Sequence, residues 1–329
     1  MRSHRAAAVM LSLILSVMGT GTVECADAAA GGATAATATP PAHYRATHVV
    51  IVVIDGPRWS ETWGEETRQY IPHRAKELLP QALLLTHFSN DGETLTTPGH
   101  TAITTGFYQD IDNGGNQFPD HPGIFQRWLR AHPDAEPTDA WLITSKDKLA
   151  VLSDCTDPEW KGKWVPANDC GKAGLGSAMR DDAITLEHAE ARLGSDHPHV
   201  ALVHFRQPDS SGHANAWDDY LQAIRDTDAD VAELWRFLQA DPGFAGLTDL
   251  FITNDHGRHP DGTRDGFISH GDGCPGCRHI ELLAMGPDIR IGESAAARNQ
   301  TDLAVTVAAI LGLTIPGSSG QVMTEIFKP

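Results

Sequence analysis

Six short hydrophobic runs along the chain predict the strands of a central sheet. The run at 47–54 is almost wholly β-branched and has no alternating polar positions. This pattern is typical of a strand that is buried on both faces of a parallel sheet. The other strands are expected at 82–87, 140–144, 199–205, 249–253 and 281–285.

Stretches with helical periodicity lie between these strands. The clearest is 217–239, where apolar residues recur near helical spacing, and others are expected at 67–79, 123–131, 177–193 and 300–311. Alternation of strands and helices predicts an α/β fold, with a mostly parallel sheet, helices on both faces and small loop insertions. The hydrophobic fraction of 41% over 329 residues is sufficient to fill such a core.

The N-terminal segment has the pattern of an export signal. Residues 1–5 are basic, residues 6–18 form an apolar run too short to span a bilayer, and Ala26-Asp27-Ala28 resembles a cleavage site. We expect a signal peptide at 1–28, a flexible linker rich in Ala, Gly, Thr and Pro at 29–43, and one catalytic domain at 44–329. A retained membrane anchor and lipidation of Cys25 are the alternatives. The mature chain is expected to be periplasmic or secreted, without a membrane span.

The formal charge of −18 limits the classes of partner. Binding to duplex nucleic acid or to an anionic membrane requires clustered Lys and Arg, so neither is expected. A small-molecule substrate fits better. An anionic substrate such as a phosphate ester would have to be held by local cations, which bound metal ions can supply.

Four cysteines follow the predicted signal peptide, and an oxidising compartment favours disulfides between them. We expect the local pairs Cys155 with Cys170 and Cys274 with Cys277. The alternative is a structural zinc ion held by Cys274 and Cys277 together with the other two thiols.

Three carboxylates follow predicted strands within a few residues. They are Asp55, Asp209 and Asp255, and the carboxyl ends of parallel strands meet at the edge of the sheet where α/β proteins place their sites. An aspartate after a strand often only caps the next helix. The joint placement of all three, however, indicates a shared site.

Imidazoles and a hydroxyl complete the pattern of a two-metal centre. His213 lies four residues after Asp209, His256 adjoins Asp255, and His270 lies between glycine-rich turns. Thr96 is a poor nucleophile alone, but a hydroxyl held beside two dications can attack phosphorus. The ligand types favour zinc, with manganese or iron as alternatives. The remaining histidines, among them His100, His204, His259 and His279, are expected to be packed or solvated.

These motifs resemble the alkaline phosphatase superfamily over about residues 47–315. The matching segments are Ile54-Asp55-Gly56, Thr96-Thr97-Pro98-Gly99-His100, Pro208-Asp209-Ser210-Ser211-Gly212-His213, Thr253-Asn254-Asp255-His256-Gly257 and Ser269-His270-Gly271. The branches that are most similar are the nucleotide pyrophosphatase/phosphodiesterases and the phosphate monoesterases with a threonine nucleophile.

The resemblance implies roles for individual residues. One zinc ion would be bound by Asp209, His213 and His270, and the other by Asp55, Thr96, Asp255 and His256. The nucleophile would be Thr96, rather than Thr97, because the family places it two residues before the proline. It would form a phosphothreonine intermediate that water then hydrolyses. A helix that begins near Pro98 would direct its N-terminal amides at the phosphoryl group.

A monoester dianion needs more cationic contacts than a diester does, and two lysines are candidates. Lys146 and Lys148 resemble the Lys-x-Arg clamp of the threonine-type monoesterases, although a lysine at 148 lacks the bidentate fork of arginine. Solvated surface lysines are the alternative. Asn116 resembles the family asparagine that donates to a phosphoryl oxygen, and Asn113 is its rival.

We therefore expect an exported, metal-dependent phosphoric ester hydrolase, most similar to a phosphate monoesterase. A nucleotide pyrophosphatase/phosphodiesterase is the first alternative, and an inactive metal- or ligand-binding protein is the second. Trp160 and Trp164, in the loop 147–176, would either stack on a nucleoside or pack within a lid.

Overall fold

The computed structural model describes residues 43–329, and its centre is a nine-stranded sheet. The strand order is β4-β3-β5-β1-β6-β7-β2-β8, with β9 paired to β2. All pairs are parallel except those that β7 makes with β6 and β2. The strands are β1 (His48–Ile54), β2 (Ala82–Ser89), β3 (Ala140–Thr144), β4 (Ala167–Cys170), β5 (Val200–Phe205), β6 (Thr248–Thr253), β7 (His279–Met285), β8 (Gly292–Ser294) and β9 (Arg298–Asn299).

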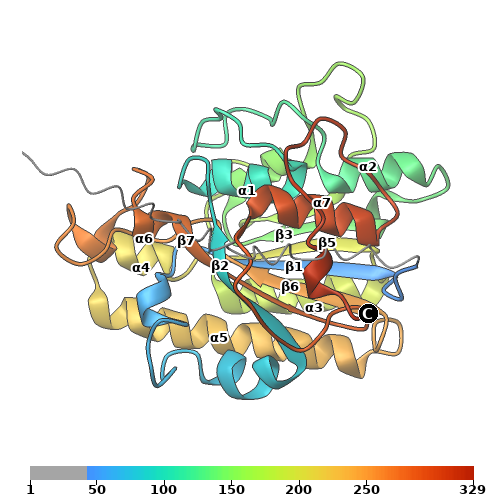
Figure 1. Ribbon diagram of the computed structural model, residues 1–329. Coiled ribbons are helices and arrows are strands. Elements are labelled where there is room, and N and C mark those ends of the chain that lie inside the picture. The colour runs from blue at the N-terminus through green and yellow to red at the C-terminus, as the bar shows by residue number, and fades with distance from the viewer. Residues whose placement is uncertain (1–42) are drawn as a thin grey trace, which may run out of the picture. The chain divides into compact units, whose positions relative to one another are not determined.

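Seven α-helices accompany these strands in the described part of the chain. They are α1 (Thr96–Thr105), α2 (Ile124–Ala131), α3 (Asp182–Asp196), α4 (Asp209–His213), α5 (Trp217–Ala240), α6 (Pro275–Arg278) and α7 (Gln300–Ile310). In Figure 1, α1, α2 and α7 cover one face of the sheet and α5 covers the other, while α4 and α6 lie at the left end. The predicted α/β fold with a mostly parallel sheet is confirmed.

The side chains of β1 divide the core into two layers. Val49, Ile51 and Val53 pack with residues of α1, α2 and α7, whereas Val50 and Val52 face α3 and α5. Every residue of β1 is buried, as expected for a strand covered on both faces. Because β5 and β6 flank β1 in parallel register, the segments that follow all three strands meet at the same edge.

Most predicted elements are present, with two clear differences. The helix predicted at 67–79 is confined to a short helical turn at Arg74–Leu78, since Pro72 interrupts the segment and Arg68 has a left-handed backbone with φ of 56°. The helix predicted from 177 begins only at Asp182 because Ala178 has φ of 89°. Strand β4 was not predicted, since its residues carry no hydrophobic run.

The predicted disulfides are not formed. Cys155, Cys170, Cys274 and Cys277 are free thiols in the structure. The Sγ of Cys170 lies in the core at the end of β4, 3.8 Å from the carbonyl oxygen of Leu142.

The predicted signal peptide and nearly all of the predicted linker lie outside the described residues. Within residues 43–329, no helix is both long and apolar enough to cross a bilayer.

Candidate active site

Three carboxylates converge at the carboxyl edge of the sheet, as predicted. Asp55 follows β1 directly, Asp255 lies two residues beyond β6, and Asp209 begins α4 after β5. Backbone hydrogen bonds tie these connections together, because the Asp55 amide donates to Phe205 O (3.0 Å) and the Asp209 amide donates to Asp55 O (3.0 Å). The parallel register therefore places three buried carboxylates around one space.

Asp55, Asp255 and His256 form the first group of candidate metal ligands. One ligand atom from each lies within 4.8 Å of the others. The Nε2 of His256 is 3.4 Å from Asp55 Oδ1 and 3.3 Å from Asp255 Oδ2. All three side chains are fully buried, and these three atoms have no hydrogen-bond partner among the described residues. Buried polar atoms without partners are costly, so the chemistry of this group fits a bound cation.

Asp209, His270 and His213 lie next to this first group. Ligand atoms of Asp209, His256 and His270 are within 4.8 Å of one another. The Nε2 of His213 lies 3.0 Å from His270 Nε2 and 3.2 Å from Asp209 Oδ1. The His213 side chain is 47% exposed, so this side of the site faces solvent. The structure thus brings together all six predicted Asp and His ligands.

The electrostatics of the carboxylates also indicate a need for positive charge. Burial raises the pKa of Asp255, and the adjacent Asp55 raises it further. Burial is the largest effect on Asp55 and opposes its ionisation, but Lys146, His204 and His256 together outweigh it and hold the pKa of Asp55 below the usual value. A single ammonium group therefore does not suffice for both carboxylates, which is the situation that a dication resolves.

Thr96 is the first residue of α1 and lies against this ligand cluster. It is 1% exposed, and its hydroxyl is reached by Lys146 Nζ at 3.4 Å. By contrast, Thr97 is engaged in the fold, since its amide and hydroxyl donate to Asn113 Oδ1 (2.9 Å) and Asn113 O (3.2 Å). Gly99 permits α1 to approach the end of β6, because a Cβ there would lie 2.6 Å from Asp255 O. The geometry favours Thr96 over Thr97 as the nucleophile.

The two lysines predicted as a clamp have different positions. Lys146 is 4% exposed and its Nζ contacts Asp209 Oδ2 (2.7 Å) and Asp55 Oδ2 (2.8 Å). Burial opposes its charge, but the two carboxylates outweigh this and raise its pKa. Lys148 instead donates to Asn113 O (2.8 Å) and Asn113 Oδ1 (3.0 Å). Lys146 thus contacts Thr96 and Lys148 contacts Asn113, and neither lysine is the exposed, solvated group of the alternative interpretation.

Asn113, rather than Asn116, lies at the site. The predicted residue Asn116 is exposed, and its amide nitrogen donates to Asp112 Oδ1 (3.0 Å) within its own loop. Asn113 Oδ1 accepts from the Thr97 amide and from Lys148, which orients its side chain at the start of α1. These side-chain contacts use the oxygen of Asn113 and not its Nδ2.

Three further residues support the cluster, and sequence reasoning had left them out. Arg258 is fully buried and donates to Asp209 Oδ1 (2.5 Å). His204 Nε2 lies 3.0 Å from Asp55 Oδ2, and His100 Nδ1 lies 2.8 Å from Thr96 O. His100 and His204 were expected to be bystanders, yet each orients a site residue. Two sequence features could have indicated these roles: His100 lies inside the motif at 96–100, and His204 lies in the buried strand β5.

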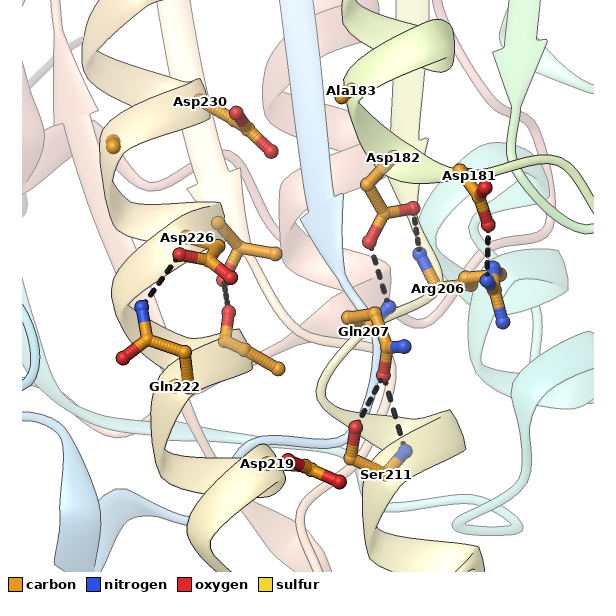
Figure 2. A pocket seen from close by; sticks show the side chains of 13 residues that line it. Asp181, Asp182, Ala183, Arg206, Gln207, Ser211, Asp219, Gln222, Asp226 and Asp230 are labelled. Carbon is orange, nitrogen blue, oxygen red and sulfur yellow. Dashed lines mark hydrogen bonds and ion pairs between the residues drawn. The ribbon is translucent and has the colours of Figure 1, made fainter.

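A cavity of about 620 Å³ lies between α3 and α5, and none of the candidate metal ligands lines it. Figure 2 shows the carboxylates of Asp226 and Asp230 on one wall and that of Asp182 on the other. Arg206 is the only basic residue in the lining, and it already pairs with Asp181 (2.7 Å). Since like charges repel, this cavity is unsuited to an anionic ester.

Residues 128–262 match the family model of type I phosphodiesterases and nucleotide pyrophosphatases. The matched segment contains Lys146, Asp209, His213, Asp255 and His256. Curated relatives include GPI ethanolamine phosphate transferase 1 of Homo sapiens, 22% identical over 71% of this chain, and that of Aspergillus oryzae, 26% identical over 69%. The chain spans only 28% and 24% of the length of these two proteins.

Solved structures of the same fold include phosphatases and phosphodiesterases. The alkaline phosphatase PafA aligns with a TM-score of 0.68 and 14% identity over 88% of this chain and 100% of its own. Murine ectonucleotide pyrophosphatase/phosphodiesterase 5 aligns with a TM-score of 0.63 and 16% identity, over 85% and 100%. A phosphonate monoester hydrolase from Silicibacter pomeroyi aligns with a TM-score of 0.60 and 14% identity, over 84% and 75%. These likenesses agree with the predicted fold.

Proposed function

We propose that the chain is a member of the alkaline phosphatase superfamily and, on this premise, a metal-dependent phosphoric ester hydrolase that prefers monoesters; its motifs, the matching family model and the shared fold support this. Thr96 is the nucleophile in this proposal. The observation that carries it is the position of Lys146, a buried ammonium group 3.4 Å from Thr96 Oγ1. A monoester dianion has more negative charge on its non-bridging oxygens than a diester, so a cation beside the nucleophile favours the monoester.

In this proposal the candidate ligands are divided between two metal sites. Asp55, Thr96, Asp255 and His256 would hold one ion, and Asp209, His213 and His270 would hold the other. Mixed nitrogen and oxygen ligation suits Zn²⁺, with Mn²⁺ or iron as alternatives. When bound, two such ions supply Lewis acidity to the attacking hydroxyl and to the departing ester oxygen.

The residues around Thr96 define the two steps of the reaction. The Thr96 oxygen attacks phosphorus in line, the bond between phosphorus and the ester oxygen breaks, and the alcohol departs with a proton. Water then attacks the phosphothreonine, which releases phosphate and restores the Thr96 hydroxyl. Lys146 holds charge near the non-bridging oxygens, and the Nδ2 of Asn113 donates to one of them.

Phosphodiester chemistry is the second candidate, and specific observations favour it. The family model is that of phosphodiesterases, and the curated relatives are named as ethanolamine phosphate transferases. In the structure, Lys148 holds Asn113 and does not reach Thr96, so only one of the two lysines offers charge there. In such an enzyme the phosphothreonine would keep one ester group. Water or an acceptor alcohol would then attack its phosphorus and break the bond to Thr96, which releases a monoester or a new diester and restores the hydroxyl.

The tryptophans in the loop 147–176 bear on whether the substrate contains a nucleoside. Trp160 and Trp164 pack against each other with centroids 5.4 Å apart, and Arg130 of α2 lies over both rings, 4.3 Å and 5.1 Å from their centroids. Their aromatic faces are thus used within the fold rather than offered to a nucleoside.

We further propose that the enzyme is exported, because of the pattern of its N-terminal sequence, and that it acts on a small phosphate ester.

Substitution of Lys146 tests the proposal. Lys146→Ala is expected to lower kcat/KM for a monoester by roughly 10²- to 10³-fold, and for a diester by clearly less. Lys148→Ala is the matched control, since it removes a lysine that contacts Asn113 but not Thr96, and should not discriminate between the substrates. Equal losses on both substrates in Lys146→Ala would contradict the monoester role.

A further inference from the structure

A third group of metal-ligating side chains lies outside the catalytic cluster. It consists of His259, Asp272, Cys274 and Cys277, and one ligand atom from each lies within 4.8 Å of all the others. We propose that these four residues bind a structural zinc ion that fixes the segment carrying His270. The proposal is independent of the catalytic role assigned to Thr96.

His259 provides the strongest evidence for this ion. Its side chain is 2% exposed, and its Nδ1 lies 2.7 Å from Asp265 Oδ1. A carboxylate on Nδ1 fixes the tautomer that leaves Nε2 as the ligand atom, which is the usual arrangement around protein-bound zinc. The Nε2 atom faces the group but has no hydrogen-bond partner among the described residues. It lies 3.2 Å from Asp272 Oδ1, as two ligands of one ion would.

The remaining ligands are held by the backbone of a tight turn. Cys274 is the N-cap residue of α6 and Cys277 lies within this helix, with the Cys-x-x-Cys spacing of many zinc sites. The Cys274 amide donates to Asp272 Oδ1 (3.0 Å), and Arg264 pairs with Asp272 Oδ2 (2.6 Å). The carboxylate is therefore oriented from both sides.

Close backbone packing brings this turn against the strand end that carries His259. The Gly257 amide donates to Cys277 O (2.8 Å), and a side chain at Gly257 would collide with the Gly276 carbonyl. At Gly276, a Cβ would lie 2.5 Å from Arg258 O. Both glycines are thus required for the approach that places His259 beside the two thiols.

The composition of the group favours zinc over a disulfide. A disulfide between Cys274 and Cys277 would use only the two sulfurs and would leave the buried Nε2 of His259 without a partner. A tetrahedral ion uses all four ligand atoms. Two thiolates with an imidazole and a carboxylate suit Zn²⁺ and form a closed set with no position for substrate, as in structural sites.

The ligands bracket His270 in sequence. His259 precedes it, whereas Asp272, Cys274 and Cys277 follow it. The same segment is anchored to Thr94, which accepts from His270 Nδ1 (2.8 Å) through its carbonyl and from the Gly273 amide (3.2 Å) through its hydroxyl. A bound ion would close the segment on both sides of His270 and limit the movement of that catalytic ligand.

Cobalt substitution of the full chain tests this proposal. Thiolate ligands give Co²⁺ a sulfur-to-metal absorption in the near ultraviolet, whereas the catalytic cluster contains no thiolate. The wild-type chain should show this absorption, Cys277→Ser should lose it, and zinc analysis should find one ion fewer per chain in that variant. Cys155→Ser, which removes a buried thiol elsewhere, and Asp209→Asn, which removes a catalytic ligand, should both retain it.

Two results would overturn the proposal. One is recovery of Cys274 and Cys277 as a disulfide when the purified wild-type chain is mapped without reductant. The other is a wild-type chain whose thiols are free but whose cobalt form lacks the near-ultraviolet absorption. Both results come from the wild-type protein, so the proposal can be tested even if a variant fails to fold.

Discussion

Lys146 donates a hydrogen bond to Thr96, with 3.4 Å between Nζ and Oγ1, from the loop that follows β3. The same ammonium contacts Asp55 and Asp209, which belong to the two different ligand groups. A single buried cation thus connects the nucleophile to both halves of the site. In the proposed function, this cation would offer an anionic ester a local positive charge in a chain whose net charge is −18.

Thr96 and Thr97 are adjacent hydroxyls with different expected roles. Thr96→Ala should lower kcat by roughly 10⁴-fold, because it removes the attacking oxygen. Thr97→Ala should lower it far less, since its hydroxyl only donates to Asn113 O. Steady-state turnover of p-nitrophenyl phosphate by the two variants distinguishes them. Comparable activities would show that Thr96 is not the nucleophile.

Asn113 and Asn116 form a second matched pair. Asn113→Ala should reduce kcat/KM by roughly 10- to 100-fold, because the donor to a phosphoryl oxygen is lost and Lys148 loses an acceptor. Asn116→Ala should retain nearly full activity, since its amide contacts only Asp112 in an exposed loop. A large loss in Asn116→Ala with little change in Asn113→Ala would reverse this assignment.

Removal of metal should abolish turnover. Asp55 Oδ1, Asp255 Oδ2 and His256 Nε2 are buried without partners among the described residues, so catalysis is expected to require bound cations there. Exhaustive chelation should lower kcat on the order of 10³-fold, and added Zn²⁺ should restore it. Circular dichroism should confirm that the chelated chain stays folded. Full turnover by folded, metal-free protein would contradict the mechanism.

Sequence patterns were sufficient to predict which carboxylates and imidazoles the fold brings together, but not the surrounding residues that orient them. Asp55, Asp209 and Asp255 were identifiable because each follows a strand, and parallel register brings strand ends to one edge. The sequence did not indicate which of Asn113 and Asn116 lies at the site, since both belong to one loop. Only the fold of that loop places Asn113 against the start of α1. Long-range contacts of this kind carry no local signal.

The same limit applies to the buried charges and thiols. Arg258 follows a recognisable motif, but nothing in its neighbours indicates that its guanidinium donates to Asp209, 49 positions earlier. Likewise, the close spacing of Cys274 and Cys277 led to the prediction of a local disulfide, whereas the fold also brings His259 and Asp272 to these two thiols. Topology, rather than spacing, determines these partners.

Asp230 should make stability depend on pH. Burial, with the neighbouring Asp182, Asp226 and Glu233, raises its pKa from 3.8 to about 7. The folded state then binds a proton more tightly than the unfolded state, so stability present below pH 4 is lost as pH rises toward and through 7. The side chain that Asp230→Asn introduces cannot ionise. The Tm of this variant should therefore exceed that of the wild type by an amount that grows as the pH rises from 4 through 7.

Asp219→Asn is the control for this effect, because Asp219 lines the same cavity but is exposed. Thermal unfolding of the three proteins at a series of pH values makes the comparison. If the Tm difference between Asp230→Asn and the wild type did not depend on pH, the claim that burial raises the pKa of Asp230 would be wrong.

The measurement that tests the central claim most directly is the ratio of kcat/KM for p-nitrophenyl phosphate to that for bis-p-nitrophenyl phosphate, with purified zinc-loaded protein and Thr96→Ala as control. We predict a ratio well above one, with both activities lost in the control. A ratio well below one, still dependent on Thr96, would contradict the monoester preference and identify the chain as a phosphodiesterase.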